Sequence, residues 1–194
     1  MVGDQEWILP QIDTNVGAGV HARAAPRYNG GYRLMINDKQ AAADEFWMEE
    51  ALRAAQRALE AGEVPVGAVV VHAGEIIGRG WNRNITDSDP TAHAEIVALR
   101  QAAAHLGNHR LGDCELFVTI EPCPMCAGAL VHSRVKRVVY GADDPKAGAI
   151  HSVLQVLNHP RLNHRTEVRG GVLAGRSAEL LQSFFRSRRE ESRC

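Results

Sequence analysis

The chain has 194 residues, of which 45% are hydrophobic and 23% charged, and this balance is typical of one ordinary globular domain. No apolar run approaches the length of a membrane span, and four cysteines are too few for a disulfide framework, which suits a reducing cytoplasm. The formal net charge of −1 neither indicates nor excludes a nucleic-acid partner.

Residues 1–40 carry scattered Gly, Ala and Arg with no sustained apolar period. We therefore predict an irregular or disordered extension over 1–40, followed by a single domain over 41–194. The extension is not a secretory signal, because Asp4 and Glu6 lie where such a signal is positively charged and no apolar core follows them.

The first predicted elements of the domain are a helix and a hairpin. Apolar residues recur at every third or fourth position over 44–61, which predicts an amphipathic helix that ends at Gly62. The β-branched run over 66–72 predicts a strand, Ala73-Gly74 a tight turn, and 75–81 the antiparallel partner strand. A polar loop over 82–89 follows.

Helices and strands alternate through the rest of the chain. A helix with Thr91 as its N-cap is expected to run to about Leu106. The next predicted elements are a strand over 114–120, a helix that begins within 122–124 and ends at 132, and a strand over 135–140. A short helix over 152–157, a strand over 166–169 and a closing helix over 173–189 complete the prediction. This order implies a partly parallel sheet with helices on its faces.

The helix that begins at 122–124 carries a pair of thiols in its first turn. Cys123 and Cys126 are three residues apart, so both side chains lie on one face, and Pro122 and Pro124 suit a helix start, where a missing N–H costs least. The unpaired N–H groups at a helix start favour negative charge. We therefore expect both sulfurs to be biased toward thiolate, the form that binds zinc.

A third zinc ligand is predicted upstream. His93 and Glu95 fall in the first turn of the preceding helix, and both can face one ion only if the ion lies near the helix end. With His93, Cys123 and Cys126 as ligands, the fourth position stays open to water, as in catalytic zinc sites. Zinc lowers the pKa of water from about 15.7 to about 7. Glu95 is the candidate proton carrier; the alternative is an ordinary first-turn acid.

His-x-Glu followed by Pro-Cys-x-x-Cys resembles the signature of the zinc-dependent nucleobase deaminases. Over roughly residues 44 to 190 the chain resembles the bacterial tRNA-specific adenosine deaminases in a series of ordered runs: 64–69, 80–83, 89–96, 121–129 and 141–146. The resemblance does not cover the N-terminal extension, which suggests the hypothesis that translation begins at Met35.

This resemblance implies a three-layer α/β/α cytidine-deaminase-like fold with a central mixed five-stranded sheet. It also implies one Zn²⁺ per subunit and hydrolytic conversion of adenosine to inosine at the wobble position of an arginine tRNA anticodon. The expected partners are the tRNA anticodon stem-loop and a second copy of the chain, because active sites of the family borrow residues across a homodimer. No membrane partner is expected.

The resemblance also predicts substrate contacts at matching positions: Asn82, Ala94, Asp144, Lys146 and Phe185. The amide of Asn82 can read a purine edge, but it can equally cap its own loop. Phe185 can stack on a nucleotide, or it can belong with Phe184 to the core or to a dimer seam. The arginines of 186–193 are either phosphate contacts or a solvated helix face.

Two other functions fit the same motifs. A small-molecule deaminase acting on guanine or cytosine would use the same zinc and glutamate, and Pro124 is shared with some guanine deaminases. A non-catalytic RNA-binding module with a structural zinc would need a fourth protein ligand, and no side chain beside the motifs is an obvious one.

Overall fold

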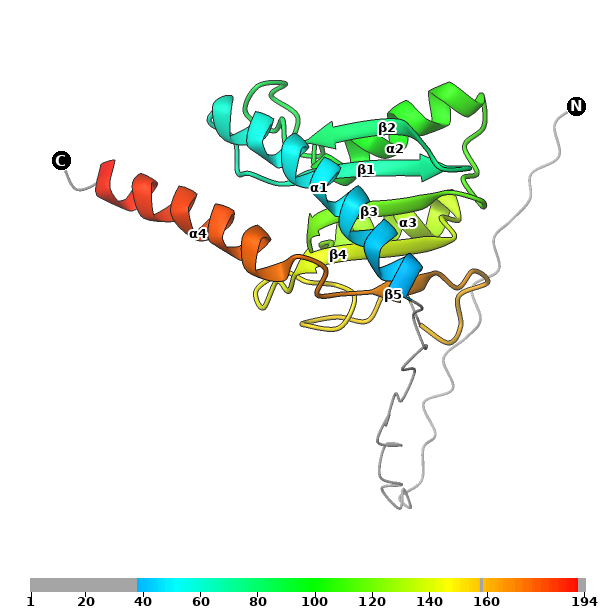
Figure 1. The fold of residues 1–194 in the computed structure, drawn as a ribbon. Helices are drawn as coiled ribbons and strands as arrows, with labels where there is room; N and C mark the ends of the chain where they lie inside the picture. Colours follow the sequence, from blue (N-terminus) through cyan, green and yellow to red (C-terminus); the bar gives the residue numbers. More distant parts are fainter. Residues whose placement is uncertain (1–37, 158, 192–194) are drawn as a thin grey trace, which may run out of the picture. The chain divides into compact units, whose positions relative to one another are not determined.

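The computed structural model describes residues 38–157 and 159–191, which form a mixed five-stranded sheet flanked by helices (Figure 1). The predicted extension lies outside the described residues up to residue 37, and so does Met35. Within the described ranges, no helix is both long enough and apolar enough to cross a bilayer.

The elements of the domain follow one another in a helix-and-strand order close to the predicted one. They are α1 (Asp38–Glu60), β1 (Gly67–His72), β2 (Glu75–Trp81), α2 (Ala94–Leu106), β3 (Glu115–Ile120), α3 (Pro124–Ser133), β4 (Arg137–Ala142), β5 (Glu167–Arg169) and α4 (Ala174–Glu191).

The sheet has the strand order β2-β1-β3-β4-β5. Strand β1 is antiparallel to both β2 and β3, whereas β3, β4 and β5 run parallel. Helix α1 covers one face, and α2 and α3 cover the other (Figure 1). This arrangement confirms the predicted three-layer fold with a mixed five-stranded sheet. Because β3 and β4 are parallel, Ile120 and Ala142 pair at the same edge, where functional loops collect.

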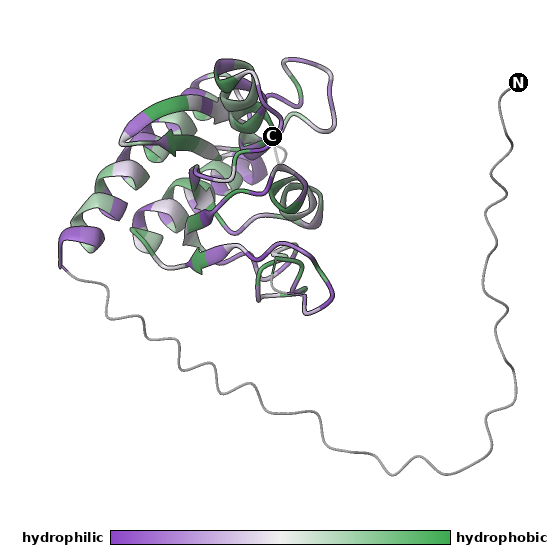
Figure 2. Ribbon diagram, turned by 90° about the vertical axis from the view of Figure 1, so that its right-hand side faces the viewer, coloured by the Kyte–Doolittle hydropathy of each residue, from purple (hydrophilic) through white to green (hydrophobic). Residues whose placement is uncertain are grey.

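The core divides between the two faces of the sheet because successive strand residues point to opposite sides. The side packed against α1 contains Val69, Val71, Phe117 and Val139. The side packed against α2 and α3 contains the alternate residues Val70, Leu116, Val118 and Val138. Figure 2 shows the strands between the helices as predominantly hydrophobic.

A glycine allows α2 to start directly on the sheet. A Cβ atom on Gly80 of β2 would lie 2.0 Å from the backbone oxygen of Ala94, a distance that no side chain tolerates. Only a residue without Cβ lets the helix approach this closely. Gly80 therefore fixes where α2 begins, and with it the position of His93, which immediately precedes the helix.

Helix α1 begins at Asp38, so the prediction that it begins near Asp44 is wrong. Asp44 is not a surface residue at a helix start; it is fully buried and accepts hydrogen bonds from Gln40 in α1 and from Arg137 and Arg169 in the sheet. The two arginines lie 93 and 125 residues away in the sequence, so the pattern around Asp44 could not indicate them.

The prediction of a short helix over 152–157 is also wrong, because this segment is a series of turns and bends. The N–H groups at its start and just before it donate to acceptors that are not the carbonyl groups of an α-helix. Those of Ile150, His151 and Ser152 donate to the carboxylate of Glu121, and that of Val153 donates to the backbone oxygen of Gly148.

The start of α2 differs from the prediction as well. Thr91 is not the N-cap, because both its N–H and its hydroxyl donate to Asp89 Oδ1. His93 is the N-cap residue, with an extended ψ of 154°, and its side chain makes no capping hydrogen bond. The imidazole is therefore not committed to its own helix.

Candidate active site

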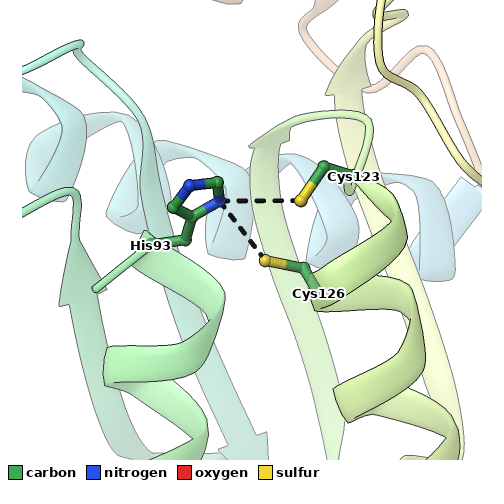
Figure 3. A group of neighbouring side chains, drawn as sticks. All are labelled: His93, Cys123 and Cys126. Carbon is green, nitrogen blue, oxygen red and sulfur yellow. Dashed lines mark hydrogen bonds between the residues drawn. The ribbon is translucent and has the colours of Figure 1, made fainter. Parts of the chain in front are cut away.

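The side chains of His93, Cys123 and Cys126 converge at the starts of α2 and α3 (Figure 3). Cys123 is the N-cap residue of α3 as His93 is of α2, and neither side chain caps its own helix. The Nδ1 atom of His93 lies 3.6 Å from the sulfur of Cys123 and 3.5 Å from the sulfur of Cys126. The structure therefore brings the predicted ligand residues to one point.

The spacing of these atoms suits one tetrahedral zinc ion. Typical zinc bonds of about 2.3 Å to sulfur and about 2.0 Å to nitrogen place the two ligand atoms about 3.5 Å apart in a tetrahedron. The three ligand atoms all lie within 4.8 Å of one another. Among the residues that the structure describes, no fourth His, Cys, Asp or Glu joins this group. The donor set thus fits a site with one open position.

Charge at the site is divided unevenly between the thiols. A hydrogen bond from Cys126 lowers the pKa of Cys123 to about 4 against the effect of burial, and His93 contributes to the same lowering. The interaction with Cys123, together with burial, raises the pKa of Cys126. Cys123 therefore ionises more readily than Cys126. A bound divalent cation favours the second thiolate as well.

Glu95 lies in the first turn of α2, one residue beyond the helix start, and it is 3% exposed. Burial raises the pKa of its carboxyl group, and the negative charge of Cys123 raises it further. A carboxyl group with a raised pKa can hold a proton and pass it on near neutral pH, which is the property a general acid and base requires.

A pocket of about 310 Å³ opens beside these residues. Its walls include Asn82, His93, Glu95, Cys123, Asp144, Lys146 and Phe185. The pocket therefore gathers most of the predicted site residues from five separate parts of the chain. A hollow of about 730 Å³ between α1 and α4 is larger, but it is lined mainly by charged and polar residues and includes none of these side chains.

Asn82 is buried at the end of β2, and its Oδ1 accepts a hydrogen bond of 3.0 Å from the backbone N–H of Ala94. It caps α2 rather than its own loop. Ala94 itself is fully buried and is not among the residues that line the pocket. Within the described structure, the link of Ala94 to the site is its backbone N–H group, which donates to Asn82.

The loop after β4 supplies Asp144 and Lys146. The Oδ1 atom of Asp144 accepts hydrogen bonds from the backbone N–H groups of Lys146 and Ala147, at 2.9 and 3.1 Å. Asp144 thus shapes its own turn. The side chain of Lys146 is exposed, and Phe185 from α4 is 46% exposed where it lines the pocket. Phe185 is therefore not a core residue of the described domain.

Glu121 is the residue whose importance the sequence reasoning missed. Its carboxylate lines the same pocket, is 1% exposed, and accepts hydrogen bonds from the loop over 144–152. Burial opposes ionisation, but bonds from Ser152, His151 and Asp144 outweigh it and lower the pKa of Glu121 to about 2. An acidic residue directly after the apolar strand 116–120 was the available signal, because a charge there must be compensated.

The MafB19-like deaminase family matches residues 42–189 of the chain. The tRNA-specific adenosine deaminase of Haemophilus influenzae is 52% identical over 151 residues, which cover 77% of this chain and 87% of that protein. The similarity therefore spans the whole described domain and nearly the whole relative.

Solved structures agree with the sequence relatives. A structure from a study of A-to-I editing by tRNA:A34 deaminases at the wobble position of transfer RNA has a TM-score of 0.68 and 45% identity, covering 70% of this chain and 99% of that one. A guanine deaminase from Nitrosomonas europaea has a TM-score of 0.62 and 29% identity, covering 72% of this chain and 83% of that one. The chain is thus similar to deaminases of both substrate classes, with higher identity to the first.

Proposed function

The chain belongs to the tRNA-specific adenosine deaminases within the MafB19-like deaminase family, and from this premise we propose that it is a zinc-dependent enzyme of tRNA editing. The proposed reaction is hydrolysis of adenosine to inosine with release of ammonia. The proposed substrate is the wobble adenosine in the anticodon of an arginine tRNA.

The observation that carries the proposal is the position of Glu95 beside the cluster of one imidazole and two sulfurs. The three ligand atoms have the spacing of a zinc site with an open position, and the buried carboxyl group of Glu95 lines the same pocket. A structural zinc site would be closed by a fourth side chain. This arrangement therefore supports catalysis rather than a purely structural metal.

His93, Cys123 and Cys126 would hold the zinc ion. When bound, zinc supplies a Lewis acid that makes water a nucleophile at neutral pH. The carboxyl group of Glu95 takes the proton that the attacking water gives up and delivers it to the purine N1. It later takes the proton of the new C6 hydroxyl group and transfers it to the departing amino group, which leaves as ammonia while the C6 carbonyl of inosine forms.

The base must enter a narrow pocket. A volume of about 310 Å³ is at the lower end of ligand pockets, which suits a single nucleobase better than a duplex. We propose that Asn82 contacts the purine edge through its amide nitrogen, since Oδ1 is bound to Ala94. An anticodon loop presents unpaired bases, so the enzyme is spared the cost of opening a helix.

The RNA flanking the target base would follow α4. A second hollow of about 400 Å³ shares Lys146, Leu181 and Phe185 with the site pocket and is also lined by Arg186 and Arg189. Phosphate contacts from Lys and Arg, with an aromatic ring for stacking, are the usual means of binding single strands. This continuity supports the predicted roles of Lys146 and Phe185. Asp144 and Ala94 stay predicted substrate contacts.

We propose further that the enzyme acts as a homodimer in the cytoplasm, as the family resemblance implies. An apolar hollow between α2 and α3, which includes Ile96, Leu99 and Ala129, offers surface for a second copy. Light scattering of the purified protein tests this part, and a mass of one chain at micromolar concentration would contradict it.

The test of the activity is incubation of the zinc-loaded protein with an arginine tRNA anticodon stem-loop and, separately, with free guanine and cytosine. We expect inosine at the wobble position and no release of xanthine or uracil. The similarity to a guanine deaminase makes guanine the informative competitor. Xanthine release without inosine formation would replace the proposed substrate with a free base.

A further inference from the structure

Glu121 connects two parts of the active site. It follows β3 directly and lies two residues before Cys123, so its backbone belongs to the segment that carries two of the candidate zinc ligands. Its backbone N–H donates to the oxygen of Ala142 at the end of β4, at 2.8 Å. The side chain is almost fully buried and lines the site pocket.

The carboxylate accepts hydrogen bonds from both ends of the segment 144–152, the first part of the connection between β4 and β5, which is called the loop below. Oε1 accepts from the N–H groups of Ile150, His151 and Ser152, at 3.0, 2.8 and 3.1 Å. Oε2 accepts from the N–H of Asp144, at 3.1 Å, and from the hydroxyl of Ser152. Both ends of the loop are thereby attached to one side chain.

The fit around this carboxylate leaves no spare room. A Cβ atom at Gly148 would lie 2.2 Å from Oε2, so the loop can close over Glu121 only with glycine at that position. The backbone N–H of Ala149 donates to the oxygen of Pro122, at 2.8 Å, which attaches the loop to the same segment a second time.

The charge of Glu121 is balanced chiefly by N–H groups. In the described structure the basic side chain near its carboxylate is that of His151, which is half exposed and lies 3.7 Å away. The imidazole of His151 lies closer to the hydroxyl of Tyr140, at 2.7 Å. A neutral amide in place of the carboxylate would point an NH₂ group at hydrogen-bond donors on one side. The negative charge therefore matters as well as the shape.

We propose that Glu121 is a positioning residue that sets substrate affinity. It fixes the loop that brings Asp144, Lys146 and Ala147 to the pocket, and the hydrogen bonds of its carboxylate go to this loop rather than to the zinc ligands. This inference rests on the proposed function, because the loop matters only if RNA or a base enters the pocket.

The experiment compares Glu121→Gln and the milder Ser152→Ala with a matched control, Asp44→Asn. Asp44 is an equally buried carboxylate that also accepts several hydrogen bonds, but its partners are Arg137 and Arg169, and Arg137 lies at the start of β4, the end remote from the site. The readouts are KM and kcat for the anticodon stem-loop, zinc per chain, the visible spectrum of the cobalt-substituted protein, and hydrogen exchange of peptides over 144–154.

For Glu121→Gln we expect KM to rise about tenfold or more with a smaller change in kcat, because a bond to a charged acceptor is lost. Zinc content and the cobalt spectrum stay unchanged, and exchange over 144–154 becomes faster. Ser152→Ala shows a smaller rise in KM of about threefold. Asp44→Asn lowers the melting temperature without changing KM.

Unchanged hydrogen exchange and unchanged KM in Glu121→Gln would overturn the proposal. Loss of zinc from Glu121→Gln would also overturn it, and so would a rise of KM in Asp44→Asn as large as that in Glu121→Gln. Exchange and zinc content do not depend on turnover. If the wild-type protein fails to edit RNA, the proposed function is wrong, and the exchange data still decide whether Glu121 orders the loop.

Discussion

The Oδ1 atom of Asn82 accepts a hydrogen bond from the backbone N–H of Ala94, and this bond ties the end of β2 to the start of the helix that His93 precedes. The N-cap residue His93 leaves this helix without a side-chain cap of its own, so Asn82 supplies one from outside. The oxygen of the Asn82 amide thus caps the helix beside the candidate metal ligand His93, and the nitrogen of the same amide is the proposed donor to the substrate.

Separating these two roles is the first prediction. Asn82→Ala removes the cap and should destabilise the protein by about 0.5–2 kcal/mol. Asn82→Asp keeps an acceptor at the helix start but has no amide donor, so stability and zinc content should be retained. Both variants should lower kcat/KM by about tenfold or more, since the donor to the purine is lost in each.

Thermal unfolding, zinc analysis and steady-state kinetics on the stem-loop check this pair. Full activity of Asn82→Asp would show that the amide nitrogen does not contact the substrate. Loss of zinc from Asn82→Asp would contradict the premise that a carboxylate at this position still caps α2 and leaves the candidate ligands in place.

The second prediction concerns Glu95. Glu95→Gln keeps the size of the side chain and its place beside Cys126 but cannot carry a proton. We expect zinc to stay bound and kcat to fall by about 10²–10⁴-fold, the usual contribution of general acid–base catalysis. Because Gln also relieves the cost of burying a carboxyl group, the variant should be at least as stable as the wild type.

Glu63→Gln is the matched control for Glu95→Gln. Glu63 is also a buried glutamate, but its Oε1 accepts from the N–H groups of Ile85 and Thr86, and it does not line the site pocket. Its kcat should stay within about threefold of the wild type, as for a residue remote from the reacting atoms. Substantial turnover by zinc-loaded Glu95→Gln would remove Glu95 from the mechanism.

The third prediction concerns the metal. A chelator should abolish editing and lower the melting temperature, and added zinc should restore both, because ligand binding to the folded state stabilises it. Cys126→Ser should lose zinc. Cys114→Ala, in which the buried Cys114 thiol outside the cluster is removed, should retain zinc despite a loss of stability. Undiminished editing by the metal-free protein would refute the zinc proposal.

The sequence predicted the site better than its surroundings. The pairing of Cys123 with Cys126 followed from their spacing within one helical turn, a local feature. The approach of His93, 30 residues upstream of Cys123, was inferred from its place at a second helix start. The hydrogen-bond partners of Glu121 could not be predicted, because they are 23 to 31 residues further along the chain, and a charge after an apolar strand indicates only that it must be compensated. The segment 152–157 is not a helix: the N–H of Ser152 donates to Glu121, that of Val153 donates to the oxygen of Gly148, and the side chains of Val153 and Leu154 are exposed.

Asp44 provides the last prediction, a test at acid pH. Its buried carboxylate is bound by Arg137 and Arg169, which join α1 to β4 and β5. Burial raises the pKa of Asp44, but the hydrogen bonds from Arg137, Gln40 and Arg169 outweigh it, and the pKa is lowered from its usual value of 3.8. A carboxyl group with a lowered folded-state pKa stabilises the fold above its unfolded pKa and loses that contribution as pH falls through the folded value.

Asp44→Asn should therefore destabilise the protein by about 3–5 kcal/mol at pH 7, since it leaves two arginines without their buried partner. The loss should start to shrink as the pH falls below about 4, where the carboxyl group becomes protonated in the unfolded chain, and it should shrink until the pH passes the lower pKa of the folded state. Urea unfolding of both proteins between pH 7 and pH 3 measures this convergence. A constant difference over that range would mean that packing of the side chain, and not its charge, joins α1 to the sheet.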